Sequence, residues 1–304
     1  MRLLSLLAGV AILAGCGGGE APSSEEDGWE LARSMSQRRS YIAAAQVGGL
    51  VYAAGGMVGE SGRPLATFQR FDPAANSWTG LQRLPEPVSA AAAAAIGSTV
   101  YVVGGQGLGR ATGRQAWAFD TERPGWRTVA SLPEPRFNHS AVALGGRLYV
   151  LGGFSFGVEH DEVFAYDPGA DRWSLETRLP RPMHAFGAVA FRGEIWVIGG
   201  RHGEELLRDV WIFDPRAGEW REGPALPKPM ELLGAAVAGD EIHAVWESVY
   251  QIYDARTGRW RDGPRPLVTR HALETFYVDG ALYTIGGCTT ALVDSPIVER
   301  RDIR

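Results

Sequence analysis

Six tryptophans recur along the chain at nearly constant spacing, and this repeat limits the possible folds more than any other feature. The steps between them are 49, 48, 47, 47 and 40 residues. Five of the six follow an aspartate by six positions, and that aspartate always follows an aromatic residue, as in Phe71-Asp72 before Trp78. A period of this length is typical of a fold built from repeated supersecondary units. The tryptophans are Trp29, Trp78, Trp126, Trp173, Trp220 and Trp260.

A pair of glycines is the second landmark, and it precedes the aspartate in most repeats. An aromatic residue stands three positions before the first glycine of each pair, as Tyr149 does before Gly152-Gly153. Forty glycines and 18 prolines in 304 residues indicate many short elements joined by tight turns. The pairs are Gly55-Gly56, Gly104-Gly105, Gly152-Gly153, Gly199-Gly200 and Gly286-Gly287.

The third repeat shows what one unit contains. Residues 140–144 predict a strand of small residues that ends at a glycine turn, and residues 147–151 predict a second strand. Residues 163–166 predict a third strand, which Asp167-Pro168 ends, and Trp173 begins a fourth. Four short strands in one repeat, with no helical periodicity, are typical of a propeller blade. We therefore expect an all-β, six-bladed β-propeller.

The glycine pair, the aromatic-Asp-Pro segment and the tryptophan six positions after the aspartate together resemble the Kelch repeat. The resemblance covers residues 28–304. It implies a Kelch-type propeller, in which the loops entering the first strand of each blade and the loops after the glycine pairs surround one mouth of the central channel. Because Kelch propellers host unrelated activities, the resemblance identifies the fold rather than the ligand.

Two departures from the repeat predict how the ring of blades closes. The fifth repeat reads Val245-Trp246-Glu247-Ser248 where a glycine pair is expected, and its connection to Tyr253-Asp254 is short. The sixth repeat ends without a tryptophan, whereas Trp29 has no repeat before it. We therefore expect the strand around Trp29 to be the outer strand of the sixth blade, beside residues 297–303. Such a closure leaves no open seam between the first and last blades.

The N-terminal segment resembles the signal peptide of bacterial lipoproteins. Arg2 precedes a mostly apolar stretch that is about half the length of a membrane-spanning helix. The sequence Leu13-Ala14-Gly15-Cys16 resembles a lipobox, which implies lipidation of Cys16; the alternative is an ordinary secretory signal with a chance cysteine. We expect a protein that is secreted and lipid-anchored in the bacterial cell envelope, at the outer membrane, in the periplasm or at the cell surface. The expected divisions are a signal peptide at 1–15, a flexible tether at 16–27 and the propeller at 28–304.

Composition and charge narrow the range of functions. The formal net charge is −5 at pH 7 and no basic cluster stands out, so nucleic acid is not an expected partner. With Cys16 lipidated, Cys288 has no disulfide partner. His160-Asp161-Glu162 and the pair His202 and Glu204 lie in predicted loops without an evident third ligand, so we expect no metal and no other cofactor. The glycines of residues 105–109 have the wrong spacing for a nucleotide-binding loop.

The candidate ligand-binding residues lie where the repeats differ at the expected channel mouth. One position of the entering loops holds an arginine in three of the six repeats, and the positions after it and after the glycine pairs vary in polarity. Arginine, histidine and aromatic side chains around a concave mouth indicate an anionic or sugar-like ligand. Alternatively, the arginines bond neighbouring loop carbonyls and are structural. The candidates are Arg39, Tyr41, Gln106, Arg136, Asn138, Phe154, His184, Arg201, Glu231, Arg270 and His271.

Three functions remain open on this evidence. The first, which we favour over catalysis, is an envelope-anchored binding module for a protein, peptide or glycan ligand. The second is an enzyme that resembles the bacterial sialic-acid mutarotases (N-acetylneuraminate epimerases), which are also six-bladed Kelch proteins. In that case Arg39, Arg136 or Arg270 would hold the carboxylate, and a histidine or Glu231 would move the proton. The third is a structural component of the envelope.

Overall fold

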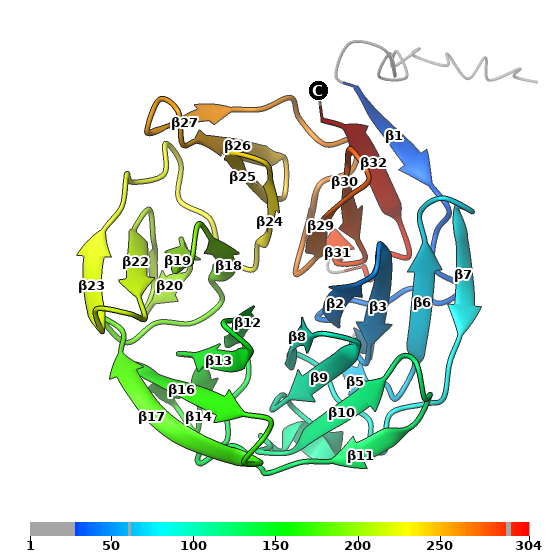
Figure 1. Ribbon diagram of the computed structural model, residues 1–304. Helices are drawn as coiled ribbons and strands as arrows, with labels where there is room; N and C mark the ends of the chain where they lie inside the picture. Colours follow the sequence, from blue (N-terminus) through cyan, green and yellow to red (C-terminus); the bar gives the residue numbers. More distant parts are fainter. Residues whose placement is uncertain (1–27, 60–61, 290–292, 304) are drawn as a thin grey trace, which may run out of the picture.

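A computed structural model describes residues 28–59, 62–289 and 293–303 of the chain. Six four-stranded antiparallel sheets form a ring around a central axis, as Figure 1 shows. The only helix in these described ranges is a short 3-10 helix, η1 (Leu108–Arg110). None of the described segments is a helix that is long and apolar enough to cross a membrane. The expected all-β, six-bladed propeller is therefore confirmed.

The strands of blades one to three are ordered from the axis outward. Blade one contains β2 (Ala43–Val47), β3 (Leu50–Ala54), β6 (Phe68–Asp72) and β7 (Ser77–Gly80). Blade two contains β8 (Ala92–Ile96), β9 (Thr99–Val103), β10 (Ala116–Asp120) and β11 (Trp126–Thr128). Blade three contains β12 (Ser140–Leu144), β13 (Arg147–Leu151), β16 (Glu162–Asp167) and β17 (Arg172–Arg178).

Blades four to six follow the same order. Blade four contains β18 (Gly187–Phe191), β19 (Glu194–Ile198), β22 (Val210–Asp214) and β23 (Glu219–Glu222). Blade five contains β24 (Gly234–Ala238), β25 (Glu241–Trp246), β26 (Val249–Asp254) and β27 (Arg259–Asp262). Blade six contains β29 (Glu274–Val278), β30 (Ala281–Ile285), β32 (Val298–Asp302) and, outermost, β1 (Trp29–Ala32).

The two ends of the propeller meet in blade six. Strand β1 pairs antiparallel with β32, with Trp29 opposite Arg301 and Ala32 opposite Val298. Figure 1 shows this pair, blue beside red, at the place where the ring closes. The predicted closure by the strand around Trp29 is therefore confirmed.

The repeated tryptophans link each blade to the one before it. In all six blades the indole N–H donates a hydrogen bond to the preceding blade or its connecting loop. Trp126 of blade two, for example, donates to the carbonyl oxygen of Gln82 at 3.0 Å. Trp29 donates in the same way to Pro264 at 2.9 Å, so it occupies in blade six the place of the other five tryptophans.

The hydrophobic core is divided among the junctions between blades. The described residues contain six clusters of buried apolar side chains, each shared by two neighbouring blades. Near the axis, small residues let the inner strands approach one another. A Cβ atom on Gly234 of β24 would lie 2.2 Å from the hydroxyl oxygen of Thr275 on β29. The fold thus narrows to a channel lined by small residues and widens outward to hold the aromatic ones.

The glycine pairs let the entering loop of the next blade pass close to the end of the second strand. A Cβ on Gly55 would lie 2.3 Å from the carbonyl oxygen of Val88, and Gly56 donates its N–H to that oxygen at 2.9 Å. Both glycines have positive φ, which costs glycine nothing. In blade five Glu247 adopts a φ of +50°, and its N–H donates to the backbone carbonyl oxygen of Arg270 at 2.6 Å. The hydrogen bond to the next entering loop is therefore kept without a glycine pair.

The loops that follow the glycine pairs, and the corresponding turn in blade five, differ in length. In blade five, β25 and β26 are joined by a turn of two residues, Glu247 and Ser248. Longer loops in the other blades carry η1 or short strands. These strands are β4 (Met57–Val58), β5 (Arg63–Pro64), β14 (Phe154–Ser155), β15 (Val158–Glu159), β20 (Arg201–His202), β21 (Glu205–Leu206) and β31 (Cys288–Thr289). Strand β31 pairs with β28 (Arg270–His271), which lies in the entering loop of blade six.

Candidate functional site

A closed ring of backbone hydrogen bonds surrounds one end of the channel. Each entering loop contributes one residue with φ between +46° and +57°. Its N–H donates to the carbonyl oxygen of the corresponding residue in the preceding blade. The bond from Tyr41 to Ala272, at 3.3 Å, joins blade one to blade six and completes the ring. The members are Tyr41, Ala90, Asn138, Ala185, Leu232 and Ala272.

Three arginines that were expected to line this mouth are instead buried inside the blades. Arg39, Arg136 and Arg270 have no exposed surface. Each guanidinium donates a hydrogen bond to the carbonyl oxygen of the first glycine of its own blade, at 2.8 Å for Arg39 and 2.9 Å for Arg136. The glycine-pair turn leaves this carbonyl without a strand partner, and the arginine supplies the missing donor.

Further contacts hold these arginines in place. Arg39 also donates to the side-chain oxygen of Gln69 at 3.1 Å, Arg270 forms an ion pair with the fully buried Glu299, and Arg136 lies over the Phe164 ring. Burial lowers the pKa of Arg39 to about 10. The same position in the other blades holds a residue without exposed surface, namely Val88, Met183 or Met230. This is a core position, so the prediction that Arg39, Arg136 and Arg270 contact a ligand is wrong, and their alternative structural role explains the contacts.

The other two sets of loop positions do meet at the mouth. In five blades, the entering-loop residue that follows the arginine position pairs as a β-bridge with the residue that follows the glycine pair. The structure thereby places five of the predicted residues in one rim. The pairs are Ser40 with Met57, Ser89 with Gln106, Phe137 with Phe154, His184 with Arg201, and His271 with Cys288.

Charged groups on this rim are already paired with one another. Arg201 of blade four donates two hydrogen bonds to Glu231, at 2.6 and 2.9 Å, so both predicted residues form one bidentate ion pair. The carboxylate of Glu159 lies 3.2 Å from Nδ1 of His184 and 2.6 Å from Nδ1 of His202. Burial lowers the pKa of His184.

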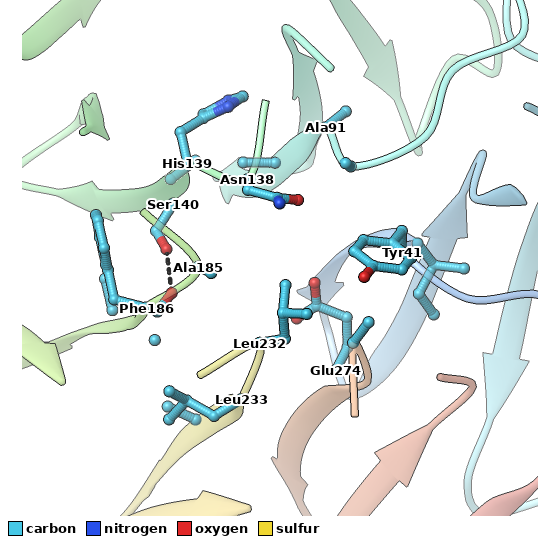
Figure 2. A pocket seen from close by; sticks show the side chains of 18 of the residues that line it. Tyr41, Ala91, Asn138, His139, Ser140, Ala185, Phe186, Leu232, Leu233 and Glu274 are labelled. Carbon is cyan, nitrogen blue, oxygen red and sulfur yellow. Dashed lines mark hydrogen bonds between the residues drawn. The ribbon is translucent and has the colours of Figure 1, made fainter. Parts of the chain in front are cut away.

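A cavity of about 120 Å³ opens inside the ring of backbone hydrogen bonds. Figure 2 shows the hydroxyl of Tyr41, the amide of Asn138 and the carboxyl of Glu274 directed toward its centre. Tyr41 and Asn138 were predicted at the mouth, and the structure places them in this cavity.

Glu274 was missed by the sequence reasoning, although the repeats contain a signal for it. It stands two positions after Ala272, and the other five blades have small residues at this position of the inner strand. They are Ala43, Ala92, Ser140, Gly187 and Gly234. A glutamate in a slot otherwise reserved for small residues fills space at the axis and introduces a carboxyl there.

The carboxyl of Glu274 makes no hydrogen bond or ion pair with any residue that the structure describes, and burial raises its pKa to about 8. The other titratable groups in the cavity wall do not ionise near neutral pH. Burial raises the pKa of Tyr41 to about 12 and lowers that of His139 to about 3. The ring of His139 also points away from the cavity (Figure 2).

Comparison with known proteins places this architecture in a family. A family model described as the KLHDC2/KLHL20/DRC7 Kelch-repeats domain matches residues 41–245, which is more than half of the chain. The chain belongs to the Kelch-repeat family. A Kelch propeller suggests a protein-interaction module, whatever its partner.

Part of this Kelch chain is similar to two curated proteins. It is 36% identical over 85 residues to Kelch-like protein 35 of Mus musculus and 32% identical over 83 residues to Kelch-like protein 23 of Homo sapiens. The matched segments cover 28% and 27% of this chain, and 14% of each relative. The chain therefore spans a small part of these relatives, and the similarity concerns the repeats.

A second hollow of about 170 Å³ adjoins the mouth cavity of the Kelch propeller. The two share Tyr41, Ala90 and Asn138 in their walls. The second hollow extends over blades one to three, where Met57, Gln106, Arg110 and Phe137 line it.

One cluster of metal-ligating types occurs among the described residues, formed by Glu134, His160 and Glu162, whose ligand atoms lie within 4.8 Å of one another. Nη2 of Arg136 is 3.6 Å from the Glu162 carboxylate and 4.0 Å from that of Glu134. Nε2 of His160 is 2.7 Å from the hydroxyl of Ser155. The guanidinium already provides the positive charge that a cation would supply, so these residues do not fit a metal site.

Cys288 of the Kelch propeller is buried, with Sγ 3.0 Å from Nε2 of His271. Burial raises the pKa of this thiol to about 11. A nucleophilic cysteine requires a lowered pKa, so this pair does not form an activated thiolate. Cys16, the predicted lipidation site, lies outside the described residues together with the rest of 1–27.

Proposed function

We propose that this Kelch propeller is a protein-binding module whose partner binds the loop face around the channel mouth. The observation that carries the proposal is a set of exposed apolar side chains on the loops that follow the glycine pairs. Leu108, Phe156 and Val293 are 64%, 78% and 49% exposed. These loops pair with the entering loops that form the mouth, so the apolar tips and the cavity belong to one face. Apolar side chains beside polar groups are typical of protein interfaces.

The two hollows at the channel mouth are each of a size that holds one side chain of a partner protein. Drug-sized ligands occupy pockets of about 300–1,000 Å³, and a cavity of about 150 Å³ holds a benzene ring. The mouth cavity and the adjoining hollow, at about 120 and 170 Å³, each match one side chain. A sialic-acid mutarotase would need a guanidinium for the carboxylate, and Arg39, Arg136 and Arg270 are buried.

Selection from a peptide display library against the purified chain tests this proposal. Enriched peptides are then measured against Phe156→Ser and against Leu175→Ser. Leu175 is 52% exposed but lies on the outer strand β17, away from the mouth, so it is the matched control. We expect Phe156→Ser to weaken binding by about tenfold or more, as at an interface hot spot, and Leu175→Ser to leave it unchanged. Peptides that bind both variants equally would contradict the proposed face.

We also propose that the propeller is held in the bacterial cell envelope by a lipid on Cys16. The support is the Leu13-Ala14-Gly15-Cys16 sequence after an apolar stretch. Mass spectrometry of the membrane fraction should detect a diacylglyceryl group on the N-terminal Cys16, and Cys16→Ser should abolish both the modification and the membrane association. A membrane-associated wild-type chain without the added mass would contradict this proposal.

A further inference from the structure

Glu274 is the group in the mouth cavity whose chemistry is least explained by the fold. Its five counterparts are small, it contacts no partner among the described residues, and its carboxyl points into the cavity (Figure 2). The side chain is half-buried, and a carboxyl group partly withdrawn from water without a partner is destabilising. A residue kept at such a cost indicates that something else supplies the missing partner.

We propose that the mouth cavity receives an ammonium group of the partner, either a lysine side chain or an N-terminal amine, which pairs with the carboxylate of Glu274. This inference rests on the proposed protein-binding function and specifies the chemistry of the partner.

The polar groups of the cavity match the hydrogen-bonding needs of an ammonium ion. An ammonium group has three donors and no acceptor. The Glu274 carboxylate, the Tyr41 hydroxyl and the Asn138 amide each offer an oxygen acceptor, and Figure 2 shows all three facing the centre of the cavity. The remaining wall is largely apolar, with Ala90, Ala185 and Leu232 among its members, which suits the methylene groups of a lysine side chain.

The charges around the mouth favour a cation over an anion. With Arg39, Arg136 and Arg270 buried, the arginine on the rim itself is Arg201, and Glu231 neutralises it. Among the residues that line the mouth cavity and the adjoining hollow, the guanidinium is that of Arg110, in the wall of the hollow rather than of the mouth cavity. The expectation of an anionic ligand depended on the three buried arginines. We therefore replace it with the expectation of a cationic group.

Three carboxylates on the same face add to this preference. Glu159 and Asp294 accept hydrogen bonds from the loops, and Glu247 lies 3.8 Å from Nδ1 of His271. Their negative charge attracts a cationic group toward the mouth before it reaches Glu274.

Blade five provides the route to the cavity. Only the two-residue turn Glu247-Ser248 joins β25 to β26, so no additional pair of short strands stands above this blade. The neighbouring blades have such pairs, β20–β21 in blade four and β28–β31 in blade six. The inner strand of this blade, β24, packs beside β29, whose first residue is Glu274. We therefore expect a partner segment to approach Glu274 over blade five, where the loop is shortest.

The proposal predicts a specific dependence on pH. A proton must leave Glu274 before it can pair with an ammonium ion, so affinity should rise by up to about tenfold per pH unit below a pKa of about 8. In the walls around Glu274, Tyr41 and His139 do not titrate in this range. The adjacent strands β2 and β24 contribute alanine and valine side chains and Gln46 to the channel. His184 on the rim contributes a pH dependence of binding that persists when Glu274 is replaced.

The test measures binding of three probes to the full chain by NMR chemical-shift changes at the Asn138 amide. Nα-acetyl-lysine methylamide presents a side-chain ammonium, glycine methylamide an α-ammonium, and Nα-acetyl-norleucine methylamide is the uncharged control. We expect one of the two amines to bind, with affinity rising from pH 6 to pH 8. Glu274→Gln should weaken it by about tenfold or more and remove the Glu274-dependent rise. The stronger amine identifies the source of the ammonium group.

Three results would overturn the inference: neither amine binds, norleucine binds as well as lysine, or Glu274→Gln binds as tightly as the wild type with the same pH profile. Display-selected peptides separate this failure from failure of the proposed function. Peptides whose binding depends on Phe156 but is unchanged by Glu274→Gln would support the proposed protein-binding face and contradict the proposed ammonium site. Unchanged unfolding temperature of Glu274→Gln at pH 5 confirms that the variant is folded.

Discussion

The indole N–H of Trp29 donates a hydrogen bond to the carbonyl oxygen of Pro264 at 2.9 Å, although 235 residues separate them in the chain. This bond repeats at the junction of blades five and six the contact that every other blade makes with its predecessor. It joins a strand from the start of the described chain to the last blades, so the propeller closes as a ring.

Replacing Trp29 by alanine should therefore destabilise the whole propeller. Trp29 has no exposed surface and packs edge-on against Tyr250 at 5.6 Å between ring centroids. Loss of a buried tryptophan costs about 3–5 kcal/mol of unfolding free energy. Urea unfolding should show this loss for Trp29→Ala, whereas Leu31→Ala, at a position 63% exposed on the same strand, should change little. Equal stability of the two variants would mean that the closing strand is dispensable.

The same reasoning applies to deletions. Removing residues 28–36 takes away β1 and should open blade six, whereas removing residues 17–26 should leave thermal unfolding unchanged. A normal melting transition after the first deletion would contradict the closure.

The repeat landmarks predicted the fold because each one meets a physical requirement of every blade. The tryptophan bridges a junction between blades, and the glycine pair makes room for the next entering loop, as at Gly55 and Val88. Such demands recur with the repeat, so they are visible in the sequence. The pairing of β1 with β32 followed from a missing landmark in the sixth repeat, which Trp29 supplies.

The candidate site was predicted only in part, because sequence position does not determine the direction of a side chain. Arg270 and His271 are neighbours in the chain, yet Arg270 points into the blade and His271 lies on the rim. Glu274 was not predicted because the candidates were loop positions, whereas this glutamate begins an inner strand.

The ion pair between Arg270 and Glu299 offers a test of the structural role of the arginines. Both side chains are fully buried, so Arg270→Met leaves a carboxylate without its partner and should cost about 3–5 kcal/mol. Adding Glu299→Gln should recover most of that loss, because blade five has Met230 and Gln251 buried at these positions. Chemical denaturation of the single and double variants measures both effects. A single variant of wild-type stability would contradict the structural role.

Stability should also depend on pH through Glu274. Its pKa is about 8 in the folded protein against 4.5 for an ordinary glutamate, so the folded state holds a proton that the unfolded state has lost between these pH values. Unfolding free energy should therefore fall as pH rises through this window, by up to about 1.4 kcal/mol per pH unit. Glu274→Gln lacks this contribution, so its advantage over the wild type should grow from pH 5 to pH 8. A constant difference would show that Glu274 is ionised throughout.

Filling the gap over blade five should block the route to the cavity. Replacing Glu247-Ser248 by the blade-four segment Arg201–Leu206, which forms β20 and β21, places a hairpin across the expected path. Display-selected peptides should then bind at least about tenfold more weakly. The same insertion at Asp279-Gly280, a turn at the opposite end of β29, is the control and should leave binding unchanged. Peptides unaffected by the hairpin would show that they reach the mouth by another route.

Hydrogen–deuterium exchange with a display-selected peptide tests most directly whether the loop face is the binding surface. We expect bound peptide to slow exchange in the loops that follow the glycine pairs, at residues 106–112 and 154–160, which carry Leu108 and Phe156. The turn at residues 168–171, between β16 and β17 at the opposite end of blade three, should exchange at the same rate with and without peptide. Slower exchange at 168–171, with the two loops unchanged, would contradict the account.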